Sequence, residues 1–215
     1  MMLHKIKMLK LCQLIAIMAL LCNAASVYSS DDCGTLKNRY GPFDYTNPDH
    51  VKNKLPIVTY AHFTSRVERL ERGETGVRPI GDIDYTLRAF PNHHRALNAV
   101  GRYRLKHPKT ANDRFYSGKC YFLRAIEFKP DDPLVYSLYG IYLYQKGDFD
   151  GSLQQYKNAL VLNPDFTEVH YNIGILYTKL DKFKLAKEHA EIAYRQGYPL
   201  PGLKNILQRK GAWDK

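Results

Sequence analysis

The spacing of apolar side chains divides the chain at about Tyr60. Beyond this residue, apolar side chains recur every three or four positions, which is the period of an amphipathic helix. The helical stretches are short and come in pairs separated by turn residues. Between residues 26 and 59 no helical period is sustained, and glycines and prolines interrupt the chain. The pattern therefore predicts an all-α domain over residues 60–215, preceded by an irregular segment.

The irregular segment is too apolar to be a free linker, because disordered linkers carry few large hydrophobic side chains. Its apolar residues are Leu36, Tyr40, Phe43, Tyr45, Leu55 and Ile57. We expect an extended segment that packs onto the helical domain.

The paired helices repeat with a period of 34 residues. Gly140 and Gly174 are one period apart, and the same offset separates Pro130 from Pro164, Phe149 from Phe183 and Ala159 from Ala193. The predicted units are residues 60–93, 94–132, 133–166 and 167–199, followed by a cap over residues 200–215. The second unit has five residues more than one period, and the excess lies in the loop 107–114. In the first unit we expect helices at residues 61–72 and 81–90, and in the cap a helix at residues 202–210.

At Tyr139-Gly140, Ala159 and Pro164 the chain resembles the tetratricopeptide repeat family, whose units carry a bulky residue, Leu-Gly and Tyr, then Ala, Phe, Ala and a closing proline. The resemblance covers residues 60–210. It implies a right-handed superhelical stack of about four helix-turn-helix units, because each pair buries its apolar face only against its neighbours. It also implies that the first helix of each unit lines a concave face that binds peptides.

The expected binding groove is basic at one end and polar and aromatic at the other. Four residues of the second unit are spaced so that a helix places them on one face: Arg95, Asn98, Arg102 and Lys106. The third and fourth units add Ser137, Ile141, Tyr144, Gln145, Tyr171, Asn172, Ile175 and Lys179. Glu168 and Asn172 depart from the pattern by which some family members hold a terminal carboxylate. An internal acidic or polar stretch of a protein is therefore the expected partner, because arginine binds carboxylates with two parallel hydrogen bonds.

Residues 1–25 have the three parts of a secretory signal peptide. A basic leader containing Lys5 and Lys7 precedes an apolar run over residues 11–21, and small residues follow it. This run is shorter than the roughly 20 residues that a membrane span needs. We expect an exported protein, periplasmic or secreted, without a stable membrane span after cleavage.

Two of the four cysteines lie in the predicted leader, so Cys33 and Cys120 remain after cleavage. Two cysteines in an oxidising compartment can pair, but counting them does not establish the bond. The sequence leaves open whether these two residues form a disulfide or stay separate thiols.

Neither catalytic chemistry nor a metal or cofactor site is indicated by the motifs. The chain has no phosphate-binding glycine loop and no nucleophile motif. His93, His94 and His107 lack the pattern of ligands that zinc sites require, so we interpret them as structural or solvated. We predict a protein that is not an enzyme, with no metal and no cofactor.

The net charge of +11 points to acidic partners, and export makes nucleic acid the weakest of these. The first hypothesis is a non-enzymatic adaptor or scaffold of the cell envelope that holds an acidic or polar protein segment in the groove. The second is a binder of an anionic polymer or surface, such as an acidic polysaccharide, through diffuse charge. The third is a structural protein that assembles with itself through its open repeat ends.

Overall fold

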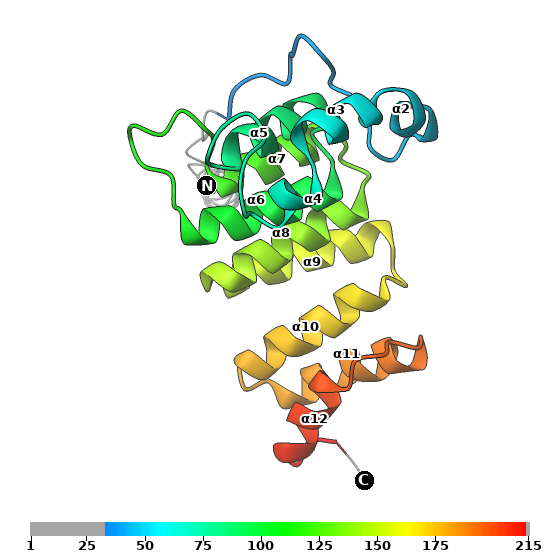
Figure 1. Cartoon of the computed structure of the whole chain (residues 1–215). Helices are drawn as coiled ribbons and strands as arrows, with labels where there is room; N and C mark the ends of the chain where they lie inside the picture. The colour runs from blue at the N-terminus through cyan, green and yellow to red at the C-terminus, as the bar shows by residue number, and fades with distance from the viewer. Residues whose placement is uncertain (1–32, 214–215) are drawn as a thin grey trace, which may run out of the picture. The chain divides into compact units, whose positions relative to one another are not determined.

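The computed structural model describes residues 33–213, which form one compact unit, and the predicted signal peptide lies outside them. Helices make up all the regular structure of this part of the chain, and they stack in chain order (Figure 1). They are α2 (Pro48–Asn53), α3 (Leu55–His62), α4 (Ser65–Glu68), α5 (Ile80–Ala89), α6 (His94–Lys106), α7 (Gly118–Phe128), α8 (Pro133–Lys146), α9 (Phe149–Leu162), α10 (Thr167–Lys179), α11 (Phe183–Arg195) and α12 (Gly202–Arg209). The predicted all-α class and the helical repeat stack are confirmed.

The third unit shows why its residues make a helix pair. Asp132 accepts a hydrogen bond from the Leu134 amide at 3.1 Å and caps α8, and Pro133 supplies the preset φ of a first helical turn. Gly147 ends the helix with a φ of 82°, a left-handed conformation that suits glycine. Asp148 then caps α9 through the Gly151 amide. The two helices are thus antiparallel neighbours joined by a minimal turn.

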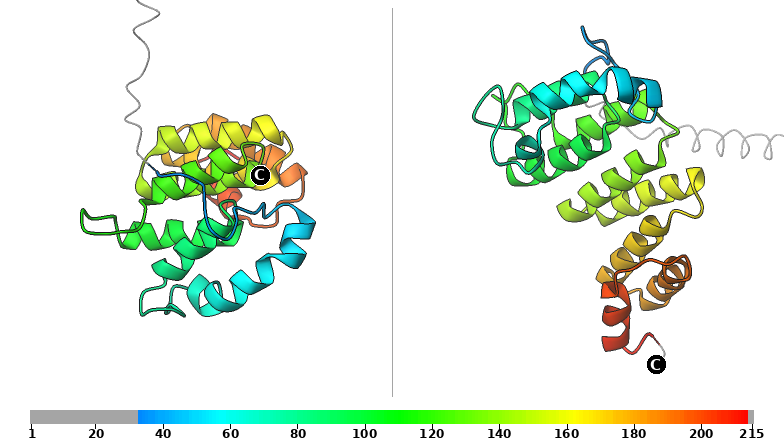
Figure 2. Two further views of the ribbon diagram at one scale, coloured as in Figure 1. Left: turned by 90° about the horizontal axis from the view of Figure 1, so that it is seen from above. Right: turned by 45° about the vertical axis from the view of Figure 1, so that its right-hand side comes forward.

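Small residues let the helices of each pair approach closely. A Cβ atom on Gly140 would lie 2.5 Å from the ring of Tyr156, and the Ser152 hydroxyl donates to the Gly140 carbonyl at 2.8 Å. In the fourth unit, a Cβ on Gly174 would meet Leu203 of the closing helix α12. The right-hand view of Figure 2 follows this packing down to α12, which covers α10 and α11 with buried leucines.

The prediction that residues 26–59 are irregular is wrong in part, because the described portion of this segment includes helices. This portion contains α2 and most of α3. Asn47 caps α2 and Pro48 is its first residue, while Pro56 lies in the first turn of α3. Prolines that interrupt a helix elsewhere are tolerated at these positions, because the first amides of a helix have no intrahelical partner.

The prediction of one helix over residues 61–72 is wrong. α3 ends at His62, and Phe63 adopts a non-helical conformation with φ −128° and ψ 53°. A single turn follows as α4, and Leu70 then takes a positive φ of 64°, which stops the helix. The side chains of Phe63 and Val67 are buried in the main core, so tertiary packing overrides local helical preference here.

The N-terminal segment is tied to the repeats covalently and by hydrogen bonds. A disulfide joins Cys33 to Cys120 of α7, which is the pairing that the sequence left open. Arg124, on the same helix, donates to the carbonyls of Cys33, Gly34 and Thr35 over 2.8–3.1 Å. This one buried guanidinium therefore holds three successive carbonyls of the segment beside the bond.

None of the described helices is long and apolar enough to cross a membrane.

Candidate partner-binding surface

The first helices of successive units lie against one another. α8 contacts α6 on one side and α10 on the other, whereas the second helices α7, α9 and α11 make no comparable contacts among themselves. Stacked helix pairs whose first helices are closer together than their second helices curve toward the first helices. We call the surface formed by α6, α8 and α10 the inner surface. The residues predicted to line the binding groove belong to these three helices.

A shallow crease between α6 and α8 brings four of the predicted residues together. Asn98 and Arg102 of α6 line it with Ile141 and Gln145 of α8. Its volume is only about 10 Å³, so it is a surface feature and not a ligand cavity. Asn98 and Gln145 are exposed, which leaves their amide groups free to meet a partner along the crease.

At the predicted basic end of the inner surface, Arg95 and Arg102 already form hydrogen bonds with Glu68 of the same chain. Two of the three guanidinium nitrogens of Arg95 donate to the Glu68 carboxylate of α4, Nε to Oε1 at 2.8 Å and Nη2 to Oε2. Arg102 donates from Nη2 to the Glu68 backbone carbonyl at 2.6 Å. The hydrogen bond from Arg95 lowers the pKa of Glu68, which stays ionised. The sequence analysis did not identify Glu68, because Arg95 and Glu68 are 27 residues apart and no local pattern predicts their contact.

The α8 residues do not all reach the surface. Tyr144 is half-buried and Gln145 exposed, but Ser137 has only 2% of its surface exposed. The prediction that Ser137 lines the groove is therefore wrong. Ser137 lies in α8, which α6, α7, α9 and α10 all contact. These neighbouring helices cover its short side chain.

The α10 residues form an aromatic and polar continuation. Tyr171, Asn172 and Ile175 are half-buried, and Lys179 is exposed at the end of the helix. The Tyr171 ring stacks on Tyr198 with centroids 4.1 Å apart, so one face of the ring is covered by the chain that leads to α12. At the opposite end of the inner surface, Lys106 is exposed where α6 stops.

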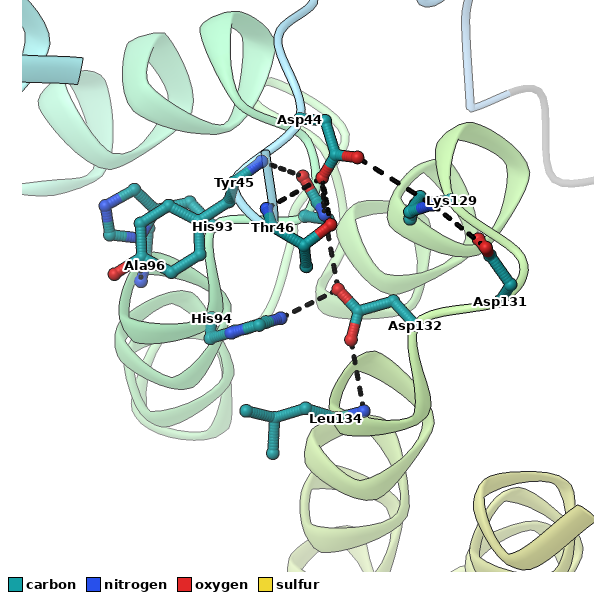
Figure 3. A network of polar contacts seen from close by, with 11 residues as sticks. Asp44, Tyr45, Thr46, His93, His94, Ala96, Lys129, Asp131, Asp132 and Leu134 are labelled. Carbon is teal, nitrogen blue, oxygen red and sulfur yellow. Dashed lines mark hydrogen bonds and ion pairs between the residues drawn. The ribbon is translucent and has the colours of Figure 1, made fainter. Parts of the chain in front are cut away.

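His93 and His94 belong to a polar network that fixes the N-terminal segment (Figure 3). His94 Nε2 contacts the Asp132 carboxylate at 2.7 Å. Asn92 donates to Asp132 and to Asp44 at 3.2 and 2.8 Å, and its own oxygen accepts from the Tyr45 amide. Asp132 also caps α8, so this network joins the segment, the second unit and the third.

His93 is a buried helix cap. Its Nδ1 accepts from the Ala96 amide at 3.2 Å, and the ring stacks on Tyr45. Burial lowers the pKa of His93 to about 3, so the ring is neutral and its nitrogen is free to accept. Residues 33–213 contain no group of three or more histidine, cysteine, aspartate or glutamate side chains arranged to hold a metal ion.

The stacked helix pairs and their inner surface define a helical repeat protein. A family model described as TPR repeat matches residues 140–181, which run from the middle of α8 through α9 and α10. This segment of the chain is a tetratricopeptide repeat region. Repeats of this family generally mediate contacts between proteins and are typically non-enzymatic, so the general role is that of an adaptor or scaffold.

Proposed function

We propose that the protein is an exported, non-enzymatic adaptor of the cell envelope that holds an acidic or polar segment of a partner protein on its inner surface. The observation that carries this is the crease between α6 and α8, where the exposed amides of Asn98 and Gln145 flank the half-buried Ile141. Amide and apolar groups side by side suit an extended peptide, whose backbone needs hydrogen bonds and whose side chains need apolar contact.

The contact between Arg95 and the Glu68 carboxylate supports an acidic partner segment. Arg95 engages Glu68 with two nitrogens, the geometry by which arginine recognises carboxylates in general. Glu68 has a quarter of its side-chain surface exposed, and Arg95 has more than half. A partner carboxylate therefore competes with a contact that solvent already weakens.

Export is supported by the predicted signal peptide together with the Cys33–Cys120 disulfide. Structural disulfides persist in oxidising compartments and are rare in the cytosol. Mass measurement of the protein isolated from its native cells tests this part. Loss of about the first 25 residues supports export, and retention of the intact N-terminus in a cytosolic fraction contradicts it.

The binding proposal is tested by affinity capture from the native envelope with a surface variant. Asn98→Glu, Lys106→Glu and Gln145→Glu change three exposed inner residues and leave the internal arginine contacts intact. The control, matched in number of substitutions and in charge, carries Gln154→Glu, Lys157→Glu and Asn163→Glu at exposed positions of α9 and its C-terminal cap. We expect a protein that wild type and control retain and the inner variant loses. Equal capture by all three folded proteins would place the partner elsewhere and refute the proposal.

A further inference from the structure

The long loop of the second unit builds a hollow beside the inner surface, and the two share Lys106 at the end of α6. Residues 107–117 connect α6 to α7, and in Figures 1 and 2 this loop projects from the stack. Together with the connection between α4 and α5 and the end of α6, it lines an open hollow of about 580 Å³. Ligand pockets in proteins commonly measure 300–1,000 Å³, so the hollow has the size of a small-molecule site.

The loop has a defined shape, fixed by side chains. Arg104 of α6 donates from Nη1 to the Asp113 carboxylate at 2.5 Å, and the other oxygen of Asp113 accepts from the Phe115 amide at 3.0 Å. Lys109 donates to the carbonyls of Asp113 and Phe115, both at 2.6 Å. These contacts hold the wall of the hollow in place, as a preorganised binding site requires.

The lining is strongly basic. Its cationic or titratable basic residues are Arg78, Arg104, Lys106, His107 and Arg114. Asp113 is the single carboxylate of the lining, and Arg104 already pairs with it. Arg78 and Lys106 form no ion pair with any residue between 33 and 213, and both are exposed. The charge facing the hollow is therefore uncompensated.

Arg104 is the buried member of the basic lining. Only 3% of its surface is exposed, and its Nε and Nη2 atoms are buried without a hydrogen-bond partner among the described residues. Leaving such donors unpaired costs roughly 1–3 kcal/mol each. Because these two atoms are shielded from solvent, Arg104 adds positive charge behind the hollow and is not itself a direct ligand contact.

We propose that this hollow binds a small organic molecule that carries an oxyanion, a phosphate or carboxylate on a sugar-sized body. The oxyanion is held by Arg78, Arg114 and Lys106, because guanidinium groups pair with such anions through two hydrogen bonds. Leu70, Val77, Pro79, Pro108 and the ring of Tyr103 provide apolar contacts for the body of the ligand. This site is separate from the crease between α6 and α8. It holds the anion at one defined position, whereas diffuse charge would attract anions over the whole surface.

The test is calorimetric titration of the purified protein with four probes at constant ionic strength: inorganic phosphate, glucose 6-phosphate, glucuronate and glucose. The site variant carries Arg78→Gln and Arg114→Gln, two exposed residues whose loss leaves the Arg104 contacts intact. Lys106 is unchanged because it also belongs to the inner surface. The control variant carries Lys157→Gln and Lys184→Gln, which remove the same charge from exposed positions on α9 and α11.

We expect glucose 6-phosphate or glucuronate to bind wild type and control at least about tenfold more tightly than glucose, and the site variant to lose about tenfold in affinity for that anion. Preference between the two anions assigns the group as phosphate or carboxylate. Equal losses in the site and control variants would mean diffuse charge and overturn the proposal. So would the absence of binding by any anion, in which case the basic residues only offset the negative end of α6.

Discussion

The two ends of the described chain are held together in different ways. Residues 33–132 are joined by contacts between segments far apart in sequence, including the disulfide, which spans 87 residues, and the bond from Tyr121 to Asp84. Residues 133–213 are joined mainly by apolar packing between neighbouring helices, and Lys187–Glu191 is the one described ion pair within them. Regular repeats are stabilised by their neighbours, whereas irregular helices need cross-links that the repeat pattern does not provide.

The largest expected effect comes from removing the cross-link. Replacing Cys33 and Cys120 by serine releases a long loop, and we expect residues 33–132 to lose about 4 kcal/mol of unfolding free energy. The sole tryptophan, Trp213, packs against Tyr194 at the other end and reports on the C-terminal repeats. Urea unfolding followed by hydrogen exchange and by Trp213 fluorescence checks this. Equal shifts at both ends would mean that the two regions unfold as one.

The second effect concerns Asp132, at the boundary between the regions. Asp132→Ala removes the cap of α8 and the partners of His94 and Asn92, and we expect a loss of about 2–3 kcal/mol in unfolding free energy. Asp131→Ala is the matched control, because this exposed neighbour contacts only the Lys129 side chain and should change stability by less than about 0.5 kcal/mol. Similar losses in both variants would show that the network of Figure 3 contributes little.

Two glycines at equivalent repeat positions differ in how closely a neighbouring ring approaches them. A Cβ on Gly140 would approach the buried Tyr156 ring to 2.5 Å, but on Gly101 its nearest neighbours lie at 3.5 Å. Gly140→Ala should therefore cost about 1–2 kcal/mol, while Gly101→Ala should be neutral or stabilise by up to about 1 kcal/mol through helix propensity. Thermal unfolding of both variants provides the comparison. A tolerated Gly140→Ala would contradict the close approach in the regular repeats.

Acid should weaken the C-terminal repeats through His189. His170 Nε2 lies 3.0 Å from the Pro164 carbonyl, which only accepts, so His170 Nδ1 must accept from His189 Nδ1 at 3.0 Å. Burial, with a smaller contribution from His170, lowers the pKa of His189 from 6.5 to about 4. The unfolded chain therefore binds a proton first, and stability is lost as the pH falls from about 6.5 toward 4.

We expect a loss on the order of 1 kcal/mol between about pH 7.5 and pH 5, read from urea unfolding by Trp213 fluorescence. His189→Asn keeps a donor near the position of Nδ1 and should flatten this pH dependence. An unchanged pH profile in that variant would assign the effect to other groups, such as His93.

The smallest effect is a gain of function. Glu68→Gln weakens the contact that holds Arg95, so an acidic partner segment should bind a few-fold more tightly. The stability cost should stay below about 1 kcal/mol because both side chains are partly exposed. Binding of a captured partner to wild type and variant measures this. A weaker complex would show that Glu68 presents Arg95 to the partner and does not compete for it.

The sequence predicted the regular half of the fold because the repeat is local information. Apolar periodicity, Gly140 and Pro164 located α8 to α11, and the closing helix α12 lies where a cap was expected. α2 was missed although Asn47-Pro48-Asp49 is a helix start, with a cap, a proline in the first turn and an acidic residue.

The remaining features could not be read from local patterns. The break at Phe63 follows from burial in the core, and the Glu68 contacts join residues that only the folded chain brings together. The exposure of Asn98 and the burial of Ser137 likewise depend on which helices cover α6 and α8. Periodicity assigns a residue to a helix face, but neighbouring elements decide whether that face is open.

Site-specific photo-crosslinking shows most directly whether the partner binds on the inner surface. A photoreactive residue is placed at Gln145 on the inner surface or at Gln154 on α9, both exposed positions, and the protein is irradiated in its native envelope. We expect one discrete protein adduct from position 145 and none of that mass from position 154. An adduct from position 154 alone, or from neither position while the partner is still captured, would contradict binding on the inner surface.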